Sequence, residues 1–189
     1  MSKNLYKVKK LNRILYARRK FKGASLGYRV AACKRLAVMG SEYMKVGDYC
    51  YFGPDCRIEA WAQYLGQTFS PLIELGKDVR INSTCHIGAI NRITIGEQCL
   101  LGSNVFITDH AHGKNTIEES FVHPSERELY SKGPVTIGAR CWIGENVVIL
   151  PNVSIGEGCV IGANAVVTKD IPSFSVAAGN PAKVVKTIK

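Results

Sequence analysis

The feature that most constrains this chain is a period of six residues. From residue 137 onward an aliphatic side chain recurs at every sixth position, at Ile137, Ile143, Ile149, Ile155, Ile161 and Val167. Glycine follows most of these residues, and the same spacing begins earlier at Val46, Leu75 and Ile95. An α-helix requires spacings of three and four, and a plain strand requires a spacing of two. A strict period of six fits neither.

A prism with three faces satisfies this period. Each hexapeptide supplies one short strand and one corner, three hexapeptides make a coil, and coils stack through main-chain hydrogen bonds about 4.8 Å apart. The repeated aliphatic residue and the small residue four places later both point into the bore. We therefore predict an all-β fold, a parallel β-helix over residues 46–172. The predicted coils are 46–63, 75–92, 95–112, 137–154 and 155–172, with 64–74 as a looser coil or loop.

Six of the seven cysteines fall at the inward position four places after a repeated aliphatic residue. They are Cys50, Cys56, Cys85, Cys99, Cys141 and Cys159. Valine or alanine holds this position in other hexapeptides, so we interpret these cysteines as small buried hydrophobic residues rather than metal ligands or disulfide partners. Unpaired cysteines also favour a reducing compartment.

Residues 1–45 do not follow the period. Leu11, Ile14 and Leu15, with Leu5 and Val8 before them, have helical spacing, which predicts an amphipathic helix at about 7–20. We expect this N-terminal segment to cap one end of the stack of coils and the tail 173–189 to cap the other.

The same segment carries all of the excess positive charge. Residues 1–41 contain twelve Lys or Arg and no acid, whereas the rest of the chain contains 13 basic and 15 acidic residues. Such a segment is either a solvated basic helix or a surface for an anionic membrane. Nucleic acid is disfavoured as a partner because no base-reading motif accompanies the charge. The chain has no apolar run of membrane-spanning length and no apolar signal-peptide stretch, so we expect a cytoplasmic protein, peripheral to the inner face of the membrane if the basic helix binds lipid.

The period is interrupted once, by the polar segment 113–136. A long loop in an economical fold usually serves function. The chain enters this loop through Thr108-Asp109-His110-Ala111-His112, so two of its four histidines lie where a coil gives way to a protruding arm. Histidine is a common general base because its imidazole titrates near neutral pH.

Five motifs occur in order across residues 76–189. They are GKDVRIN at 76–82, ITIGEQCLLGSNVFITDHAH at 93–112, LYSKGPVTIGARCWIG at 129–144, VVTKDIP at 166–172 and AAGNPAKVVK at 177–186. Together they resemble the hexapeptide-repeat sugar O-acetyltransferases, the galactoside and maltose O-acetyltransferase group and the related capsule and lipopolysaccharide O-acetyltransferases. The resemblance implies a left-handed β-helix, a homotrimer, acetyl-CoA as co-substrate without a metal, and a sugar or polysaccharide acceptor.

The resemblance also implies roles for individual residues. His112 corresponds to the catalytic base, and His110, two residues earlier, is the alternative. Asn82 and Asp109 would contact the sugar. The implied acetyl-CoA contacts are Trp142, Glu145, Ala163, Thr168, Lys169, Lys183 and Lys186. The acid that contacts sugar in the galactoside enzymes corresponds to Ile90 here, so the identity of the acceptor stays open.

Three other functions remain in view. An amino-sugar N-acetyltransferase would need the same base. A zinc carbonic anhydrase on this scaffold would gather histidines such as His86, His110 and His112. A non-enzymatic β-helix scaffold would need neither the arm nor the histidines. The tail motifs VTKDIP and AAGNPAK favour an enzyme that uses acetyl-CoA.

Overall fold

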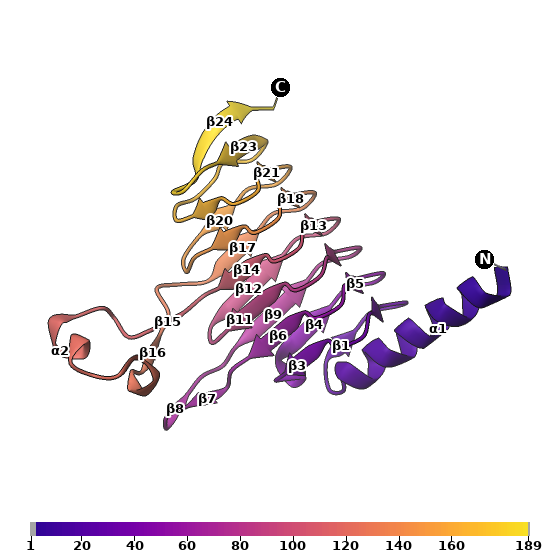
Figure 1. The fold of residues 1–189 in the computed structure, drawn as a ribbon, viewed down its shortest axis with the longest axis horizontal. Helices are drawn as coiled ribbons and strands as arrows, with labels where there is room; N and C mark the ends of the chain where they lie inside the picture. Colours follow the sequence, from indigo (N-terminus) through magenta and orange to yellow (C-terminus); the bar gives the residue numbers. More distant parts are fainter. Residues whose placement is uncertain (1–2, 189) are drawn as a thin grey trace.

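Three parallel sheets form the faces of a triangular prism (Figure 1). The structure, a computed structural model, describes residues 3–188, with the side chains of the first helix from Lys9 onward. Each coil contributes one short strand to each face, and the core is a single column of buried side chains along the bore. The fold is the parallel β-helix predicted from the period of six, and it has the left hand that the resemblance implied.

The three faces are named A, B and C. Face A contains β1 (Ser25–Leu26), β4 (Met44–Val46), β9 (Leu72–Leu75), β12 (Arg92–Ile95), β17 (Val135–Ile137) and β20 (Ser154–Ile155). Face B contains β2 (Ala31–Ala32), β5 (Tyr51–Phe52), β10 (Arg80–Ile81), β13 (Leu100–Leu101), β18 (Trp142–Ile143), β21 (Val160–Ile161), β23 (Ser175–Ala178) and β24 (Lys183–Thr187). Face C contains β3 (Ala37–Met39), β6 (Arg57–Ala60), β11 (His86–Ala89), β14 (Phe106–Thr108), β19 (Val148–Ile149) and β22 (Val166–Val167).

The corners explain why glycine follows so many repeated aliphatic residues. A Cβ at Gly96 would lie 2.5 Å from the backbone nitrogen of Ala139 in the next coil, closer than two such atoms can approach. Two residues later the chain turns through a left-handed residue, as at Gln98, whose φ is 58°. The N–H of Gln98 donates to the carbonyl of Lys77 in the coil before it, at 2.8 Å. Regular corners are therefore held by backbone contacts between coils.

The inward position of the six cysteines is confirmed. All six are buried, and all seven cysteines of the chain are unpaired. Their thiols donate to carbonyls of neighbouring coils, as Cys99 does to Gly138 at 3.0 Å. Burial raises the pKa of the Cys50 thiol to about 11. The seventh cysteine, Cys33, is half-buried and lies 3.1 Å from the hydroxyl of Tyr51.

The stack begins one coil earlier than the boundary at residue 46 that the sequence predicted. Helix α1 (Lys3–Lys20) is followed directly by β1, β2 and β3, which pair in parallel with the strands of the next coil. The small Ala32 pairs with Phe52. The ring of Phe21, at the end of α1, is buried 4.9 Å from the ring of Phe52. An aromatic side chain from the helix thus fills space that a larger repeat residue would occupy.

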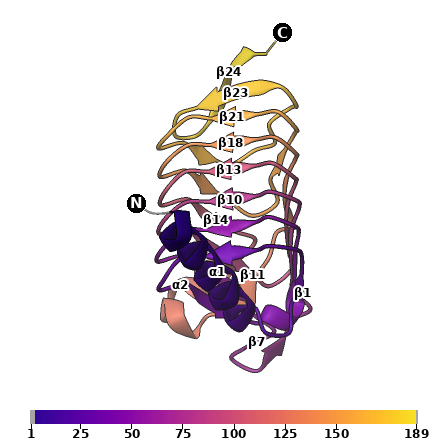
Figure 2. The ribbon, with the colours of Figure 1, turned by 90° about the vertical axis from the view of Figure 1, so that its right-hand side faces the viewer.

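Helix α1 lies over face B, most closely β2 (Figure 2), and its N-terminal end points away from the coils (Figure 1). Ala17 is buried, whereas Leu11 and Leu15 are more than half exposed. The apolar side chains of Leu5 and Val8 lie outside the described part of the helix. At the other end, β23 continues face B, and β24 pairs with it antiparallel. No helix in residues 3–188 is long and apolar enough to cross a membrane.

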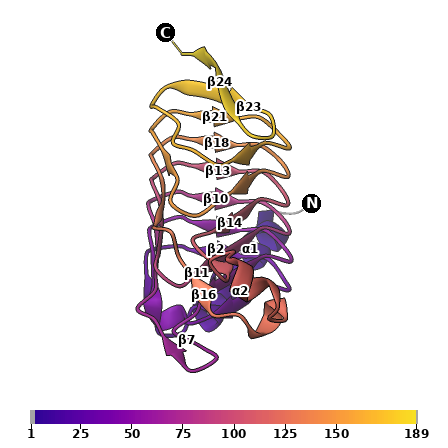
Figure 3. The ribbon, with the colours of Figure 1, turned by 90° about the vertical axis from the view of Figure 1, so that its left-hand side faces the viewer.

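The arm predicted at residues 113–136 projects from the corner between faces C and A (Figure 3). Its base is an antiparallel pair, β15 (Ala111–His112) with β16 (Leu129–Tyr130), and it carries the short helix α2 (Ile117–Ser120). Residues predicted as a loose coil or loop form instead a hairpin of β7 (Gln63–Tyr64) and β8 (Gln67–Thr68).

This hairpin supports the arm. The N–H of Leu129 donates to the side-chain oxygen of Gln67 at 2.7 Å, and the amide nitrogen of Gln67 donates back to the carbonyl of Leu129 at 3.2 Å. The hydroxyl of Tyr64 donates to the carbonyl of Ser125 at 2.7 Å.

Candidate active site

The site is built on a buried aspartate at the corner where the arm begins. Asp109 occupies the inward column that Ala60 and Ala89 occupy in the two preceding coils, and it has no exposed surface. One carboxylate oxygen accepts the N–H of Ile90 at 2.9 Å, and the other accepts the N–H of Asn91 at 2.8 Å. The carboxylate therefore replaces the carbonyl that receives such N–H groups at regular corners.

His110 is oriented by this carboxylate. Its Nδ1 lies 3.0 Å from Oδ1 of Asp109 and 3.3 Å from the hydroxyl of Thr108. Because an ionised carboxylate only accepts hydrogen bonds, Nδ1 carries the proton and Nε2 keeps its lone pair. The side chain of His110 is 14% exposed. An imidazole with a fixed tautomer and a free Nε2 is the arrangement that a general base needs.

A second carboxylate–imidazole pair lies beside the first. Nε2 of His86 lies 3.0 Å from Oε2 of Glu59, and the same carboxylate accepts a hydrogen bond from Arg57 at 2.9 Å. Burial works to raise the pKa of Glu59, but Arg57 and His86 together outweigh it and hold that pKa below its usual value. Burial, with the charge of Arg57, also lowers the pKa of His86.

Gly88 separates the two imidazoles. A Cβ at this position would lie 3.5 Å from Nε2 of His86 and 3.6 Å from Cε1 of His110. Unlike the corner glycines, Gly88 meets no backbone at close range. The absence of its side chain leaves the space between the two rings open.

His112 contributes to the same site from the arm. It is exposed, its Nδ1 lies 3.4 Å from the hydroxyl of Tyr64, and the two rings meet edge to face with centroids 5.5 Å apart. Of the two histidines predicted as the base, His110 is held by a buried carboxylate and His112 by a weak contact to a tyrosine.

These groups line one pocket of about 310 Å³ on face C, below the arm. Its walls include Trp61, Tyr64, Phe106 and Leu129, and its polar groups are Arg57, Glu59, Thr108 and the histidines at 86, 110 and 112. Aromatic walls with a few convergent polar groups are typical of small-ligand sites, including sugar sites.

Asp109 and Asn82, the two residues expected to contact the sugar, do not line this pocket. Asp109 was expected to contact the sugar, but it is fully buried and both of its oxygens are engaged, so it contacts His110 instead. Asn82 is exposed at the opposite corner of face C, before β11, and does not line the pocket.

The residues expected to contact acetyl-CoA lie on the last coils. Glu145 and Ala163 stack at the corner between faces B and C, and Thr168 and Lys169 lie at the corner between faces C and A. Trp142, at 55% exposure, faces outward from face B. Lys183 and Lys186 are exposed on β24. The turn before β24 crosses face C, where the N–H of Ala182 donates to the carbonyl of Val166 at 2.8 Å.

Within one chain, the described residues contain no group of three His, Cys, Asp or Glu side chains placed to hold a metal ion. His86, His110 and His112, the three histidines considered as zinc ligands, contact Glu59, Asp109 and Tyr64 respectively.

Sequence reasoning left Glu59 out of the site and named His86 only among the histidines that a zinc enzyme would gather. The register of face C contains the signal that would have found them. Glu59, Gly88 and Thr108 each follow a repeated isoleucine by one residue, so they stack in one outward column. His86 and its neighbours precede those isoleucines and form the next column.

Comparison with known proteins agrees with this architecture. A family model for the bacterial transferase hexapeptide, described as six repeats, matches residues 134–169, and a model for the hexapeptide repeat of succinyl-transferase matches residues 92–108. These two matches fall on the coils on either side of the arm.

Two relatives illustrate the sequence similarity. The first, WbbJ of Escherichia coli K12, bears the name of a lipopolysaccharide biosynthesis O-acetyl transferase and is 44% identical over 119 residues, which are 61% of this chain and 60% of WbbJ. The chain thus spans about 60% of the length of that relative. A protein of Schizosaccharomyces pombe that bears the name of an acetyltransferase is 33% identical over 182 residues, covering 84% of this chain and 83% of its own.

Solved structures share the fold. AntD, an N-acyltransferase from Bacillus cereus solved with dTDP and coenzyme A, superposes with a TM-score of 0.75 at 19% identity, over 92% of this chain and 88% of AntD. A maltose O-acetyltransferase from Clostridium difficile 630 superposes with a TM-score of 0.59 at 24% identity, over 95% of this chain and 88% of its own. The repeats, the arm and the sequence similarity along most of the chain together show that the protein belongs to the hexapeptide-repeat acetyltransferase family.

Proposed function

We propose that the protein transfers an acetyl group from acetyl-CoA to a hydroxyl group of a sugar, with His110 as the general base. The observation that carries this proposal is the buried Asp109–His110 pair, which leaves Nε2 of His110 free at the edge of a pocket of about 310 Å³. The preference for His112 that the resemblance implied is replaced by His110, because, of these two histidines, only His110 has a carboxylate to orient it.

The proposed reaction needs only one base. The sugar hydroxyl gives its proton to Nε2 of His110 as its oxygen forms a bond to the carbonyl carbon of the thioester. When the tetrahedral intermediate collapses, the carbon–sulfur bond breaks and the imidazolium returns the proton to the departing sulfur of CoA. Asp109 stabilises the imidazolium in between, because it accepts the Nδ1–H throughout.

The second pair suits the acceptor. Glu59 contacts His86, which faces His110 across the space at Gly88, and Trp61 and Phe106 supply apolar walls. A pyranose presents several hydroxyl groups and one apolar face. The carboxylate can accept hydrogen bonds from the hydroxyl groups, and the aromatic wall can pack against the apolar face. We assign Glu59 to hold a hydroxyl other than the one that reacts. WbbJ, by its name, acts in lipopolysaccharide biosynthesis, which supports a surface polysaccharide or its precursor as the acceptor.

The last coils fit the co-substrate. Coenzyme A carries phosphates, and Lys169, Lys183 and Lys186 are exposed and form no ion pair among the described residues. Lysine binds phosphate as a point charge. The exposed indole of Trp142 and the corner amides near Glu145 and Ala163 offer an apolar surface and N–H donors. Acetyl-CoA would supply the activated acetyl group there.

We also propose a homotrimer in a reducing, cytoplasmic compartment. On helix α2, Ile117 is 76% exposed and Phe121 is 87% exposed, and a neighbouring prism would cover them. The trimer is checked by light scattering after size-exclusion chromatography. The unpaired cysteines support the compartment.

The decisive experiment measures acetyl transfer to a panel of sugars, amino sugars and sugar nucleotides by mass spectrometry. His110→Ala should lower kcat at least about 100-fold, the usual loss when a general base is removed. His112→Ala should cost about tenfold or less, because it lines the pocket without an orienting carboxylate. His123→Ala is the matched control, since His123 is exposed on the arm and contacts only Ser125.

The outcomes separate the alternatives. A larger loss in His112→Ala than in His110→Ala would return the base to His112. Transfer only to amino sugars would make the protein an N-acetyltransferase with the same base. Unchanged kcat in both variants would contradict the proposal.

A further inference from the structure

A second cavity lies between α1 and face B. Helix α1 is on the side of the molecule opposite to the arm (Figure 1). The volume of this cavity is about 540 Å³, larger than that of the histidine pocket. The helix approaches face B closely only at its C-terminal end, where Ala17 and Phe21 are buried. Toward its N-terminal end the helix diverges, and the gap between helix and sheet forms the cavity, here called the basic cleft.

Positive charge lines both walls of the basic cleft. Lys9, Lys10 and Arg13 come from the helix, and Arg29 and Arg80 come from the first coils. No aspartate or glutamate lines the cleft. Arg80 pairs with Asp78 at 3.1 Å, but the other four cations form no ion pair among the described residues. Residues 1–41 contain no acid that could neutralise them.

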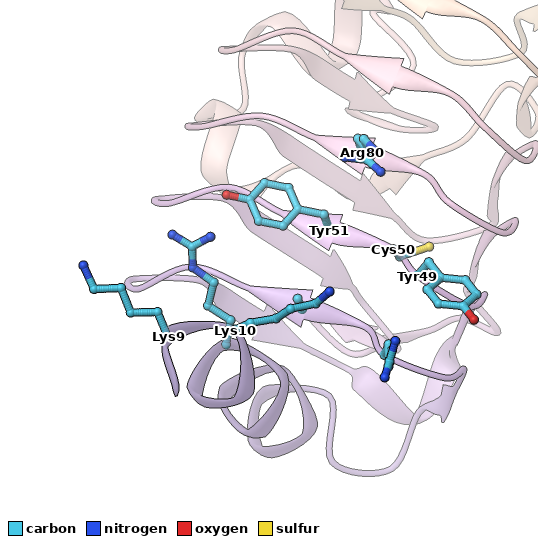
Figure 4. Close-up of a pocket in the computed structure, with 9 residues that line it drawn as sticks. Lys9, Lys10, Tyr49, Cys50, Tyr51 and Arg80 are labelled. Carbon is cyan, nitrogen blue, oxygen red and sulfur yellow. The ribbon is translucent and has the colours of Figure 1, made fainter. Parts of the chain in front are cut away.

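Two tyrosines complete the cleft. In Figure 4, Lys9 and Lys10 rise from the helix on one side of the gap, and Tyr49, Tyr51 and Arg80 come from the coils on the other. Tyr49 is 43% exposed, and Tyr51 is half-buried. Phenol hydroxyls donate hydrogen bonds, and their rings provide a flat apolar wall.

This arrangement of charges favours the binding of an anion. Like charges around one concave surface repel one another, and the low-dielectric walls of a cleft strengthen their field. The same field attracts an anion, and arginine with lysine is the residue pair that recognises phosphate oxygens. Four unpaired cations spread over a cavity of this size match a group with several charges better than a single carboxylate.

We propose that the basic cleft binds a diphosphate group. A diphosphate presents charged oxygens on two adjacent phosphorus atoms, so it can contact the helix side and the sheet side of the cleft together. Activated sugars are carried on diphosphates, either of a soluble nucleotide or of a membrane lipid. The cleft therefore holds the carrier end of the acceptor, and this role, unlike the binding itself, rests on the proposed function. Because the cleft and His110 lie on opposite sides of one chain, they act together only across a subunit boundary.

The test measures binding of inorganic pyrophosphate by isothermal titration calorimetry without CoA, because CoA itself contains a diphosphate and would compete for the cleft. We expect binding that weakens steeply with salt. The double variant Lys10→Gln/Arg13→Gln should raise the Kd at least about tenfold, as expected when charge-assisted hydrogen bonds are lost. Both residues are exposed, so the fold should be unchanged by circular dichroism.

Lys45→Gln is the matched control, because Lys45 is an exposed lysine on face A. Its replacement removes one positive charge, as each of the two cleft substitutions does. It should leave the Kd within about twofold, as expected for a screened surface charge. Failure of pyrophosphate to bind, or equal weakening by the control and the cleft variant, would overturn the proposal.

Two further binding measurements identify the source of the diphosphate. Binding of UDP at least as tight as that of pyrophosphate identifies a soluble sugar nucleotide. Binding to phosphatidylcholine vesicles that contain a polyprenyl diphosphate, without binding of UDP, identifies a lipid carrier. Equal binding to vesicles that contain phosphatidylglycerol instead would make the cleft a general membrane contact and contradict the proposal. All three measurements are independent of acetyl transfer, so their outcome stands apart from that of the enzymatic assay.

Discussion

Two kinds of corner occur in this prism, and they differ in what satisfies the backbone. At a regular corner the N–H of a left-handed residue such as Gln98 donates to a carbonyl of the coil before it. At the corner that opens into the arm, the side chain of Asp109 accepts two backbone N–H groups of the coil before it, from Ile90 and Asn91. The regular corner repeats itself, whereas the Asp109 corner ends the repeat and fixes an imidazole. The residue that stabilises the interruption of the repeat is therefore also the residue that orients His110, the proposed base.

The largest effect is expected from replacing Asp109 at the corner that opens into the arm. Asp109→Asn should lower kcat at least about 100-fold, because an amide cannot both accept the two N–H groups and hold the Nδ1–H of His110. It should also lower the free energy of unfolding by about 1 to 3 kcal/mol, the cost of a buried polar group left unsatisfied. Enzyme kinetics and urea denaturation measure the two losses.

Asp170→Asn tests whether this effect belongs to the buried corner. Asp170 also accepts a backbone N–H, from Ser154 at 2.7 Å, but it is exposed on the last coil. Asp170→Asn should lower the free energy of unfolding by less than about 1 kcal/mol, because water replaces the lost contact. Similar losses in the two variants would mean that the two corners do not differ as described.

Two glycine substitutions, one at a regular corner and one beside the histidines, are expected to have effects of intermediate size. A Cβ at Gly102 would lie 2.7 Å from the backbone nitrogen of Glu145, so Gly102→Ala should lower the free energy of unfolding by about 1 to 3 kcal/mol, the range for overpacking. Gly88→Ala should cost less than about 1 kcal/mol, because its Cβ meets only imidazole atoms at 3.5 Å and beyond. It should nevertheless raise KM for the sugar, since it fills the space between His86 and His110. Equal destabilisation by the two variants would show that Gly88 is a stacking glycine like the others.

The smallest expected effect concerns pH. Because the pKa of His86 is lowered from 6.5, the unfolded chain takes up a proton before the folded chain does as the pH falls below 6.5. Stability is thus complete above that value and declines below it, by about 1 kcal/mol or less. His86→Gln should flatten the change in the urea midpoint between pH 7.5 and 5.5. An unchanged slope would mean that His86 titrates alike in both states.

Much of the fold was predictable because the bore requires an apolar side chain at the same two positions of every hexapeptide. The period of six and the inward cysteines follow from that requirement, and they are confirmed. The first coil was missed although Leu26, Ala32 and Val38 keep the same spacing, because Ala32 is too small to stand out and Phe21 of the helix supplies the missing volume.

The site was less predictable for a related reason. A polar residue beside a histidine looks like a substrate contact, and only the register of face C places Asp109 in the inward column of Ala60 and Ala89. The same register stacks Glu59 with Gly88. The choice between His110 and His112 depends on which imidazole meets a carboxylate, and motif spacing does not contain that information.

The pairing of β23 with β24 has a consequence for how long the molecule is. Parallel coils present the same unsatisfied edge at every level, so nothing in their interior limits how many are stacked. The reversed strand β24 ends that series on face B at one end, and the ring of Phe21 fills the bore at the other. Chain length is thus decided at the ends. Removing β24 would expose an open edge at that end only, and the expected product is a pair of molecules joined at this edge rather than an unfolded chain.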